Sequence, residues 1–376
     1  YTGRLPLVEA ELEKNEAYKM LMKMVDKVKV MGVRTNAETP LDAIHGLKFG
    51  AEGIGLFRTE HMFYGEGSEA PLLLLRKMIV SKTETERRAV LDELYTYVEK
   101  DVKETLSIMK GRPVTIRLLD PPLHEFVPHD VEKLRELSLE LNINMNVLRN
   151  RVLALHENNP MLGHRGVRLG VSYPEITEMQ IRAILEATAE LLKAGKKAFP
   201  EIMIPVTCTA NELHHQKKIL DRVYQEVCQK YKVRSIPYLF GTMIEIPRAA
   251  LQAAQMAEVA DFFSFGTNDL TQTCLGMSRD DSGSFLAPYQ EAEVFKKNPF
   301  ASVDQTGVGQ LMKIAIAKGQ QTRPGIKLGI CGEHGGDPDS VKFCHKIGLT
   351  YVSCSPYRVP VARLAAAQAA IADAKK

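Results

Sequence analysis

Short runs rich in Val, Ile and Phe alternate with longer amphipathic stretches along most of this 376-residue chain. Such alternation is typical of parallel strands joined by crossover helices. Eight runs of this kind favour a sheet closed into a barrel, an α/β fold of the (β/α)8 or TIM type, over an open doubly wound sheet. The predicted strands lie at residues 28–33, 53–57, 114–119, 201–206, 238–244, 262–266, 327–331 and 351–355.

Two segments fall outside that alternation. Residues 9–28 are charged and rich in Met and Leu at helical spacing, which predicts an amphipathic lead helix before the barrel. The connection between Asp120 and Pro200, after the third strand, is much longer than the others. It predicts an insertion above the barrel with helices at 131–155 and 178–194. No repeat of fixed period and no Gly/Ser linker divides the chain further.

The length of the chain exceeds that of a usual single domain, but a β/α barrel with insertions can absorb it as one core. We therefore expect a lead segment at 1–27 and one barrel domain at 28–376. The chain begins with Tyr1 and not with Met, so we interpret it as a fragment or a processed form of a longer protein.

Charge and composition exclude several classes of partner. The 49 basic residues are nearly balanced by 46 acidic ones, and a net charge of +3 leaves no field to hold nucleic acid or an anionic membrane. No apolar run reaches the roughly 18 to 20 residues of a membrane helix. The 6 cysteines form no CxxC pair, which indicates a reduced, intracellular protein. We expect a cytoplasmic location, or an organellar one if a transit segment lies outside this chain.

Two acidic residues follow predicted strands, Glu245 directly and Asp269 in the turn just after. In such barrels the reacting groups lie at the carboxyl ends of the strands, and Glu245 and Asp269 each end an apolar run there. A divalent cation such as Mg²⁺, which prefers one or two carboxylates with waters and substrate oxygens, would compensate both charges. The spacing leaves open the alternative of an ion pair with Arg248 or Arg279 and no metal.

Two arginines occupy equivalent places. Arg58 and Arg117 stand at the ends of the second and third predicted strands, where a guanidinium offers a fork matched to phosphate or carboxylate oxygens. Their alternative is an ion pair with Glu60 or Asp120. Any anion would have to be held by such local groups, because the chain as a whole is nearly neutral.

The remaining candidates are uncharged. Asn268 could donate to a phosphate oxygen, or it could cap the helix that follows. Cys331 lies at the end of a predicted strand, in a Gly-flanked turn that would present its thiol to the cavity; a buried Cys is otherwise an inert packing residue. His334 lies close to the same turn and could be a hydrogen-bond partner.

Several motifs together resemble one known family. The strings are GIGLFRTEHMF, TIRLLDPPLHEF, NPMLGHRGVRLG, GTMIEIPRAAL, FFSFGTNDLTQ, GICGEHGGDP and YVSCSPYRVP. They resemble the C-terminal barrel of the pyruvate phosphate dikinases over residues 30–369, nearly the whole chain. Phosphoenolpyruvate (PEP) synthase and enzyme I of the sugar phosphotransferase system share that barrel, but RTEHMF, LDPPLHEF and CGEHGG look like the dikinases.

The resemblance implies a Mg²⁺ cofactor and a role for each matched residue. Glu245 and Asp269 would ligate the metal, which holds pyruvate or PEP, and Cys331 would transfer the proton at C3 of the substrate. Arg58 and Arg117 would be catalytic together with Cys331, because with Arg165 they would neutralise the transferring phosphoryl group and the enolate oxygen. The resemblance implies a wider substrate-binding set: Arg58, Arg117, Arg165, Glu245, Gly266, Thr267, Asn268, Asp269 and Arg279.

The dikinase family converts ATP, phosphate and pyruvate into AMP, diphosphate and PEP with a histidine as phosphoryl carrier. None of the 10 histidines here follows Thr-Ser, and no GxxxxGK[ST] string is present. We therefore expect only the pyruvate/PEP half-reaction, with phosphohistidine and ATP-binding domains as partners and a homodimer implied by the resemblance. The alternatives are the barrel of PEP synthase or enzyme I, or a barrel that binds ligand without turnover.

Overall fold

The computed structural model describes residues 12–65 and 67–374, and its centre is a closed barrel of eight parallel strands in sequence order. Strand β1 pairs with β8 from Gly32–Tyr351 to Thr35–Cys354, which closes the sheet. This confirms the predicted (β/α)8 fold. The strands are β1 (Gly32–Ala37), β2 (Ile54–Arg58), β3 (Pro113–Arg117), β4 (Phe199–Ile204), β5 (Leu239–Ile244), β6 (Phe262–Phe265), β7 (Lys327–Ile330) and β8 (Tyr351–Cys354).

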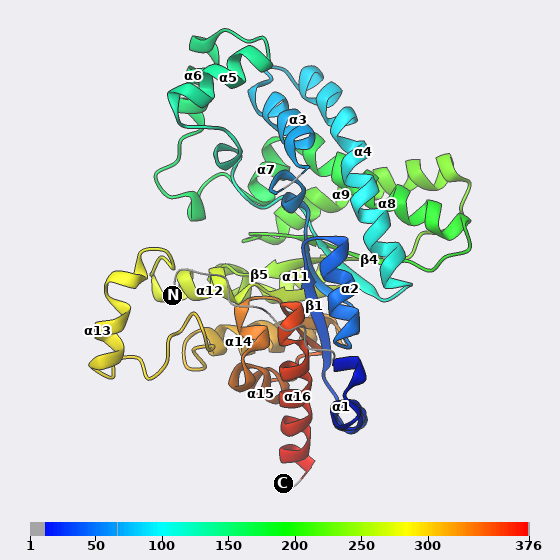
Figure 1. Ribbon diagram of the computed structural model, residues 1–376, viewed down its shortest axis with the longest axis vertical. Coiled ribbons are helices and arrows are strands. Elements are labelled where there is room, and N and C mark those ends of the chain that lie inside the picture. The colour runs from blue at the N-terminus through cyan, green and yellow to red at the C-terminus, as the bar shows by residue number, and fades with distance from the viewer. Residues whose placement is uncertain (1–11, 66, 375–376) are drawn as a thin grey trace.

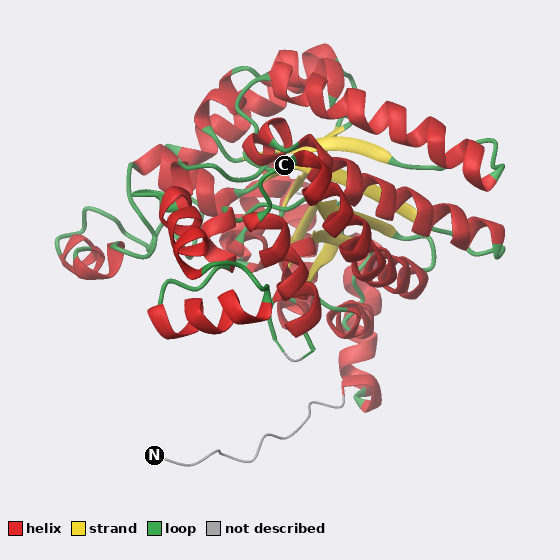
Figure 2. Ribbon diagram, turned by 90° about the horizontal axis from the view of Figure 1, so that it is seen from above, coloured by secondary structure: helices red, strands yellow, loops and turns green. Residues whose placement is uncertain are grey.

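Helices surround the strands on both sides of the barrel (Figures 1 and 2). Helices α3 to α6 lie on one side in Figure 1, and α14 to α16 lie on the other. The helices are α1 (Glu16–Val28), α2 (Pro40–Lys48), α3 (Glu69–Val80), α4 (Glu84–Met109), α5 (Val131–Glu140), α6 (Met145–Leu155), α7 (Val167–Ser172), α8 (Pro174–Lys193), α9 (Ala210–Tyr231), α10 (Pro247–Leu251), α11 (Ala253–Val259), α12 (Thr267–Leu275), α13 (Leu286–Glu291), α14 (Val308–Thr322), α15 (Pro338–Lys346) and α16 (Val359–Ala374).

Short 3₁₀ turns follow the strands and start or end several connections. They are η1 (Leu12–Lys14), η2 (Thr59–Phe63), η3 (Leu123–Phe126), η4 (Pro160–Leu162), η5 (Ser282–Ser284), η6 (Glu333–Gly336) and η7 (Pro356–Arg358). Turns η2, η3, η6 and η7 come after β2, β3, β7 and β8, so they build the rim at the carboxyl end of the barrel.

Alternation along the strands divides the core into two parts. Side chains that point outward pack under the helices in one large apolar cluster. Side chains that point inward form a smaller cluster of Leu56, Met203, Met243, Phe262 and Cys331. The barrel interior is therefore a packed core, as layers of inward side chains require, and not a pore.

The beginning of the chain differs from the prediction. The predicted first strand at 28–33 is wrong, because α1 continues to Val28 and β1 begins only at Gly32. Of the predicted lead helix, residues 9–11 lie outside the described residues, and the rest is η1 followed by α1. Met22 and Val25 of α1 pack against Ala367 of α16, so the lead helix lies on the barrel wall.

The insertion after β3 also differs in detail. One helix was predicted over 131–155, but the chain turns at Asn142, whose φ is +51°, and forms α5 and α6 instead. Asn144 caps α6 by accepting the N–H of Asn146 at 2.9 Å. The connection between β2 and β3, with helices α3 and α4, is a second long insertion that the sequence analysis missed.

A search of the described helices finds none that is both long and apolar enough to cross a lipid bilayer.

Candidate active site

The carboxyl ends of five strands bring most of the predicted residues to one mouth. Arg58 and Arg117 are the last residues of β2 and β3, and Glu245 directly follows β5. Asp269 lies in the first turn of α12, after β6, and Cys331 directly follows β7. All five residues were predicted from sequence as site residues.

Ion pairs join several of these residues into a network centred on Asp120. The Arg117 guanidinium lies 2.8 Å from Asp120 Oδ2 and also pairs with Glu60. Arg165 binds Asp120 with two nitrogens, at 3.1 and 2.6 Å, and its Nη2 lies 3.1 Å from Asp269 Oδ2. Both partners considered as alternatives for Arg117 are therefore present, and Arg117 and Arg165 together link β3 to the turn after β6.

Burial and charge act against each other in this network. Burial alone would raise the pKa of the Asp120 carboxyl, but Arg117 and Arg165 lower it below its usual range. The charge of Asp120, together with Glu60 for Arg117 and Asp269 for Arg165, raises the pKa values of both guanidiniums in spite of burial. The two arginines and Asp120 therefore stay ionised together.

Arg58 has a different partner from the two considered. It pairs with Glu38, whose Oε1 also lies 2.9 Å from His61 Nε2. Glu60 is bonded to Arg117 instead. The side chain of Arg58 is 28% exposed, so part of its guanidinium remains accessible at the rim of the mouth.

The two predicted metal ligands are buried to different degrees. Glu245 is 2% exposed, and its Oε1 accepts the Val206 N–H at 2.6 Å. Burial, together with the charges of Asp269 and Asp120, raises the pKa of Glu245 to about 8. Burial likewise raises the pKa of Asp269, and Asp120 adds to this effect although Arg165 opposes it. Added positive charge at this position would therefore stabilise both carboxylates.

The ion pairs considered as alternatives to a metal are not those found. Arg248 donates to the carbonyl of Cys208 at 2.5 Å, and the backbone N–H of Arg279 donates to Gln272 Oε1 at 2.7 Å. Asp269 is paired with Arg165, and within residues 12–65 and 67–374 no ion pair involves Glu245. The same residues contain no group of three His, Cys, Asp or Glu side chains placed to hold a metal. Any metal here would need oxygen ligands from water or substrate.

Gly266 lets the Glu245 side chain sit against the end of β6. A Cβ added at Gly266 would lie 2.5 Å from Met243 Sδ and 2.7 Å from Glu245 Oε2. Real Cβ atoms do not approach so closely, so a larger residue would displace the carboxylate. Gly266 therefore contributes to the site by leaving room for the Glu245 carboxylate, because it has no side chain that could bind substrate.

The next two residues hold the loop after β7. Asn268 Oδ1 accepts the N–H of Glu333 at 3.0 Å, so this side chain does not cap α12. The Thr267 hydroxyl lies 2.7 Å from His334 Nδ1, and His334 Nε2 lies 2.8 Å from the Pro299 carbonyl oxygen. His334 is fully buried, and it acts as the predicted hydrogen-bond partner within the fold.

Cys331 and Arg279 occupy opposite environments. Cys331 is 3% exposed, and burial raises the pKa of its thiol to about 11. Its carbonyl accepts a hydrogen bond from Asn36 at 3.1 Å, which fixes the turn after β7. Arg279 is exposed on the connection after α12. The structure therefore brings Cys331 to the mouth and leaves the Arg279 side chain outside the ion-pair network.

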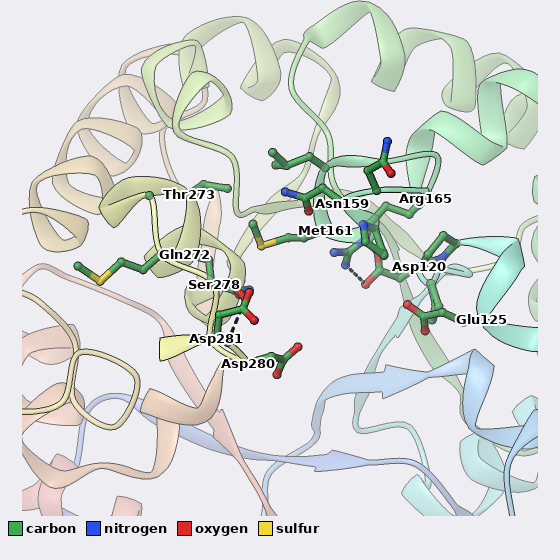
Figure 3. Close-up of a pocket in the computed structure, with 17 residues that line it drawn as sticks. Asp120, Glu125, Asn159, Met161, Arg165, Gln272, Thr273, Ser278, Asp280 and Asp281 are labelled. Carbon is green, nitrogen blue, oxygen red and sulfur yellow. Dashed lines mark hydrogen bonds and ion pairs between the residues drawn. The ribbon is translucent and has the colours of Figure 1, made fainter. Parts of the chain in front are cut away.

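A large cavity opens beside the network. It has a volume of about 990 Å³, and its walls come from the segment after β3, the 158–162 segment and the connection after α12. Figure 3 shows Asp120 and Arg165 on one wall and Asp280 and Asp281 on another. The central position of Asp120 was missed as a functional feature, although its place directly after the third strand resembled that of Glu245.

Comparison with known sequences defines the class of protein. The family model described as "PEP-utilising enzyme, PEP-binding domain" matches residues 12–371. The chain therefore belongs to the PEP-utilising enzymes and corresponds to their PEP-binding domain.

Several similar proteins are larger proteins of one kind. Pyruvate, phosphate dikinase of Clostridium symbiosum is 52% identical over 373 residues, which cover 99% of this chain and 42% of that protein. The enzyme of the same name from Rhizobium meliloti is 53% identical over 370 residues, covering 98% and 40%. The one from Giardia intestinalis is 49% identical over 371 residues, covering 99% and 41%. The predicted resemblance is confirmed, and the chain spans about two-fifths of the length of these relatives.

Proposed function

We propose that this chain carries out the pyruvate/PEP half-reaction of a dikinase. The observation that carries the proposal is the meeting of Glu245 and Asp269 with Arg117 and Arg165 at one barrel mouth, in a chain about half identical to pyruvate phosphate dikinases. Two carboxylates suit a divalent cation, and two guanidiniums suit a phosphoryl group. ATP-dependent turnover would require parts of the longer relatives.

We propose Glu245 and Asp269 as ligands of Mg²⁺. The fit rests on the raised pKa of both carboxyls, since a nearby cation would favour their ionised forms. A family that uses PEP is consistent with a divalent metal, and two protein carboxylates are a usual number for Mg²⁺. When bound, Mg²⁺ would act as a Lewis acid toward the carboxylate and C2 oxygens of the substrate.

The arginines neutralise charge on the phosphoryl group and on the enolate oxygen. Arg117 and Arg165 remain ionised, and their Asp120 partner holds their forks in place before substrate arrives. Arg58, at the rim, would reach the outer phosphate oxygens, and Asn268 would donate to the phosphate through its amide. Thr267 keeps that turn in place, and we assign Arg279 to the border of the site.

Cys331 serves as the proton donor at C3. In the direction that forms pyruvate, the P–O bond of PEP breaks and an N–P bond forms on the histidine of the partner domain, which accepts the phosphoryl group. The enolate that remains then takes the thiol proton at C3. A thiol with a pKa of about 11 is protonated at neutral pH, which suits this role. In the other direction the thiolate removes a proton from the methyl group of pyruvate.

The partners and the boundaries remain part of the proposal. We assign residues 28–376 to the catalytic barrel domain and 1–27 to a lead that connects it to phosphohistidine and ATP-binding domains of a longer protein. We further propose a homodimer through this domain, in the cytoplasm or an organelle. The relatives support the further domains, because they extend well beyond the part that this chain matches.

Binding of oxalate, a mimic of the enolate, tests the metal site. We expect Glu245→Gln and Asp269→Asn to weaken Mg²⁺-dependent oxalate binding by at least about 100-fold in calorimetry, since each removes a charged ligand. Glu333→Gln, at an exposed carboxylate on the same rim, is the matched control. Unchanged binding in both site variants would rule out these two residues as the ligands.

Proton exchange separates an enzyme from a barrel that only binds. We expect Mg²⁺-dependent loss of the methyl protons of pyruvate in D₂O, followed by NMR, and we expect Cys331→Ala to abolish it. Oxalate binding without exchange in the unmodified chain would favour a non-catalytic barrel. Phosphoryl transfer to the small histidine-carrier protein of sugar transport would favour the alternative of an enzyme I barrel.

A further inference from the structure

Arg165 enters the site from a segment with little regular structure. Residues 156–166 join α6 to α7 and contain only the short turn η4. The end that leads into α7 is held by the N–H of Gly166, which donates to the Asp120 carbonyl at 2.9 Å. The residues just before Arg165 need contacts of their own if Arg165 is to meet Asp120 and Asp269 at the same time.

Glu157 holds the residues just before Arg165 in place. Its Oε1 accepts the N–H of His164 at 2.6 Å. The backbone of Gly163 sits so close to the same carboxylate that a Cβ there would collide with Oε2. Because His164 directly precedes Arg165, Glu157 fixes the peptide unit from which the arginine extends.

Arg168 holds the opposite side of this turn. Its Nη1 donates to the carbonyls of Leu162 and Gly163, at 2.9 and 2.6 Å. The turn is therefore fixed through an N–H by Glu157 and through two carbonyls by Arg168. Neither side chain is one of the groups assigned to substrate or metal.

Besides the His164 N–H, the Glu157 carboxylate has an ionisable neighbour, His124. Its Oε2 is buried and has no hydrogen-bond partner among the described residues, and the same holds for His124 Nδ1. The two atoms lie 3.9 Å apart, too far for a hydrogen bond. The hydrogen bond from the His164 N–H, at 2.6 Å, is therefore much shorter than the contact with His124 and is the stronger restraint on this carboxylate.

We propose that Glu157 is a positioning residue that holds the Gly163–His164 turn and thereby sets the place of Arg165 in the site. The effect on catalysis rests on the proposed function, whereas the effect on the turn does not. Displacement of a catalytic group by about 1 Å can lower a rate by about 100-fold, so loss of this clamp affects turnover more than folding.

Turnover variants test the clamp. We expect Glu157→Ala to lower the rate of pyruvate methyl exchange by about 100-fold with little change in KM. Glu157→Gln keeps an oxygen acceptor and should restore the rate to within a few-fold. The matched control is Glu86→Ala: the Glu86 carboxylate also accepts backbone N–H groups, from Lys82 at 2.8 Å and Thr83 at 3.2 Å, but it lies at the start of α4.

A double-mutant cycle tests whether Glu157 acts through Arg165. In an Arg165→Ala background, Glu157→Ala should cause no further loss, because the group that it positions is gone. Gly163→Ala should resemble Glu157→Ala, since the new methyl group must displace the carboxylate. Combining Gly163→Ala with Glu157→Ala should then add nothing.

Amide hydrogen exchange gives a result that does not depend on activity. The His164 amide should exchange slowly in the unmodified chain and much faster in Glu157→Ala, with the barrel strands unchanged. Equal protection in both proteins, a normal rate for Glu157→Ala, or multiplicative losses in the cycle would overturn the proposal. If the unmodified chain shows no pyruvate exchange at all, the proposed function fails, and the amide experiment still decides whether Glu157 holds the turn.

Discussion

The two ends of the barrel interior both contain buried charge, but the charges are paired differently. At the amino end, Glu201 of β4 accepts hydrogen bonds from Arg34 of β1 at 2.8 Å and from Thr115 of β3 at 2.7 Å, and it also pairs with Lys327. At the carboxyl end, Glu245 has the Val206 N–H as a hydrogen-bond partner but no ion pair within the described residues.

The difference is visible in the protonation of the two carboxyls. Burial alone would raise the pKa of both. Arg34 and Lys327 reverse that effect and lower the pKa of Glu201, whereas the pKa of Glu245 rises to about 8. The charge at the amino end is compensated by the chain itself. At the mouth, burial and the neighbouring carboxylates favour the neutral form of Glu245, and a carboxyl perturbed in this way is typical of a functional site.

Arg34 also connects the amino end to the wall of the site. Its guanidinium carbon lies 3.8 Å from the centre of the Tyr351 ring. That ring packs directly over Gly329, two residues before Cys331 on the same side of the strand. Because Glu201 is paired by the chain and Glu245 is not, substitutions at the amino end should act mainly on folding, and substitutions at the mouth mainly on ligand binding.

The largest expected effect is the loss of the charge on Glu201. We expect Glu201→Gln to lower the free energy of unfolding by about 3 to 5 kcal/mol, because it leaves Arg34 buried beside a neutral group. Glu245→Gln is the matched change at the other end. It should leave stability unchanged or slightly higher, because its amide oxygen can still accept the Val206 N–H. Urea unfolding at neutral pH measures both.

The reverse order of stabilities would contradict this division of the barrel. If Glu245→Gln destabilised the fold as much as Glu201→Gln, the mouth carboxylate would be part of the structural core. In that case the raised pKa of Glu245 would belong to the structural core and would not support the proposed metal site.

The sequence predicted which residues reach the mouth better than it predicted their partners. Glu245, Asp269 and Cys331 could be placed because parallel strands end at the same edge, so any polar residue after an apolar run must lie there. The pairing of Arg58 with Glu38 could not be predicted, since it depends on the register between β1 and β2, where the pairing shifts between Thr35 and Asn36.

Turns limited the prediction of the fold in a similar way. The first strand was placed four residues too early because Val28, Val30 and Val33 resemble a strand, although α1 continues through Val28. The break between α5 and α6 depends on a left-handed Asn142, and Asn adopts that conformation only in some contexts. Local composition alone does not determine either boundary.

A smaller effect is expected from filling the space beside Glu245. Gly266→Ala would place a methyl group against Met243 and Glu245, and we expect a loss of about 1 to 3 kcal/mol in stability together with weaker Mg²⁺-dependent oxalate binding. Gly283→Ala is the control, because a Cβ there meets nothing within 4 Å. Normal oxalate affinity in Gly266→Ala would show that the position of the Glu245 carboxylate is not critical.

The smallest expected effect is a change with pH in the contribution of Glu201 to stability. This effect concerns the amino end of the barrel alone. The folded-state pKa of Glu201 is lowered, so its contribution to stability is complete above its unfolded pKa of about 4.5 and is lost as the pH falls toward the folded value. The difference in unfolding free energy between the unmodified chain and Glu201→Gln should therefore be constant from pH 7 to about 5.5 and should shrink below about pH 4.5. The difference between the unmodified chain and Gly283→Ala should not depend on pH.

A Glu201→Gln difference that stayed constant down to about pH 3 would mean that Glu201 is not ionised against Arg34 and Lys327. The contrast between the two ends of the barrel would then not be one of charge.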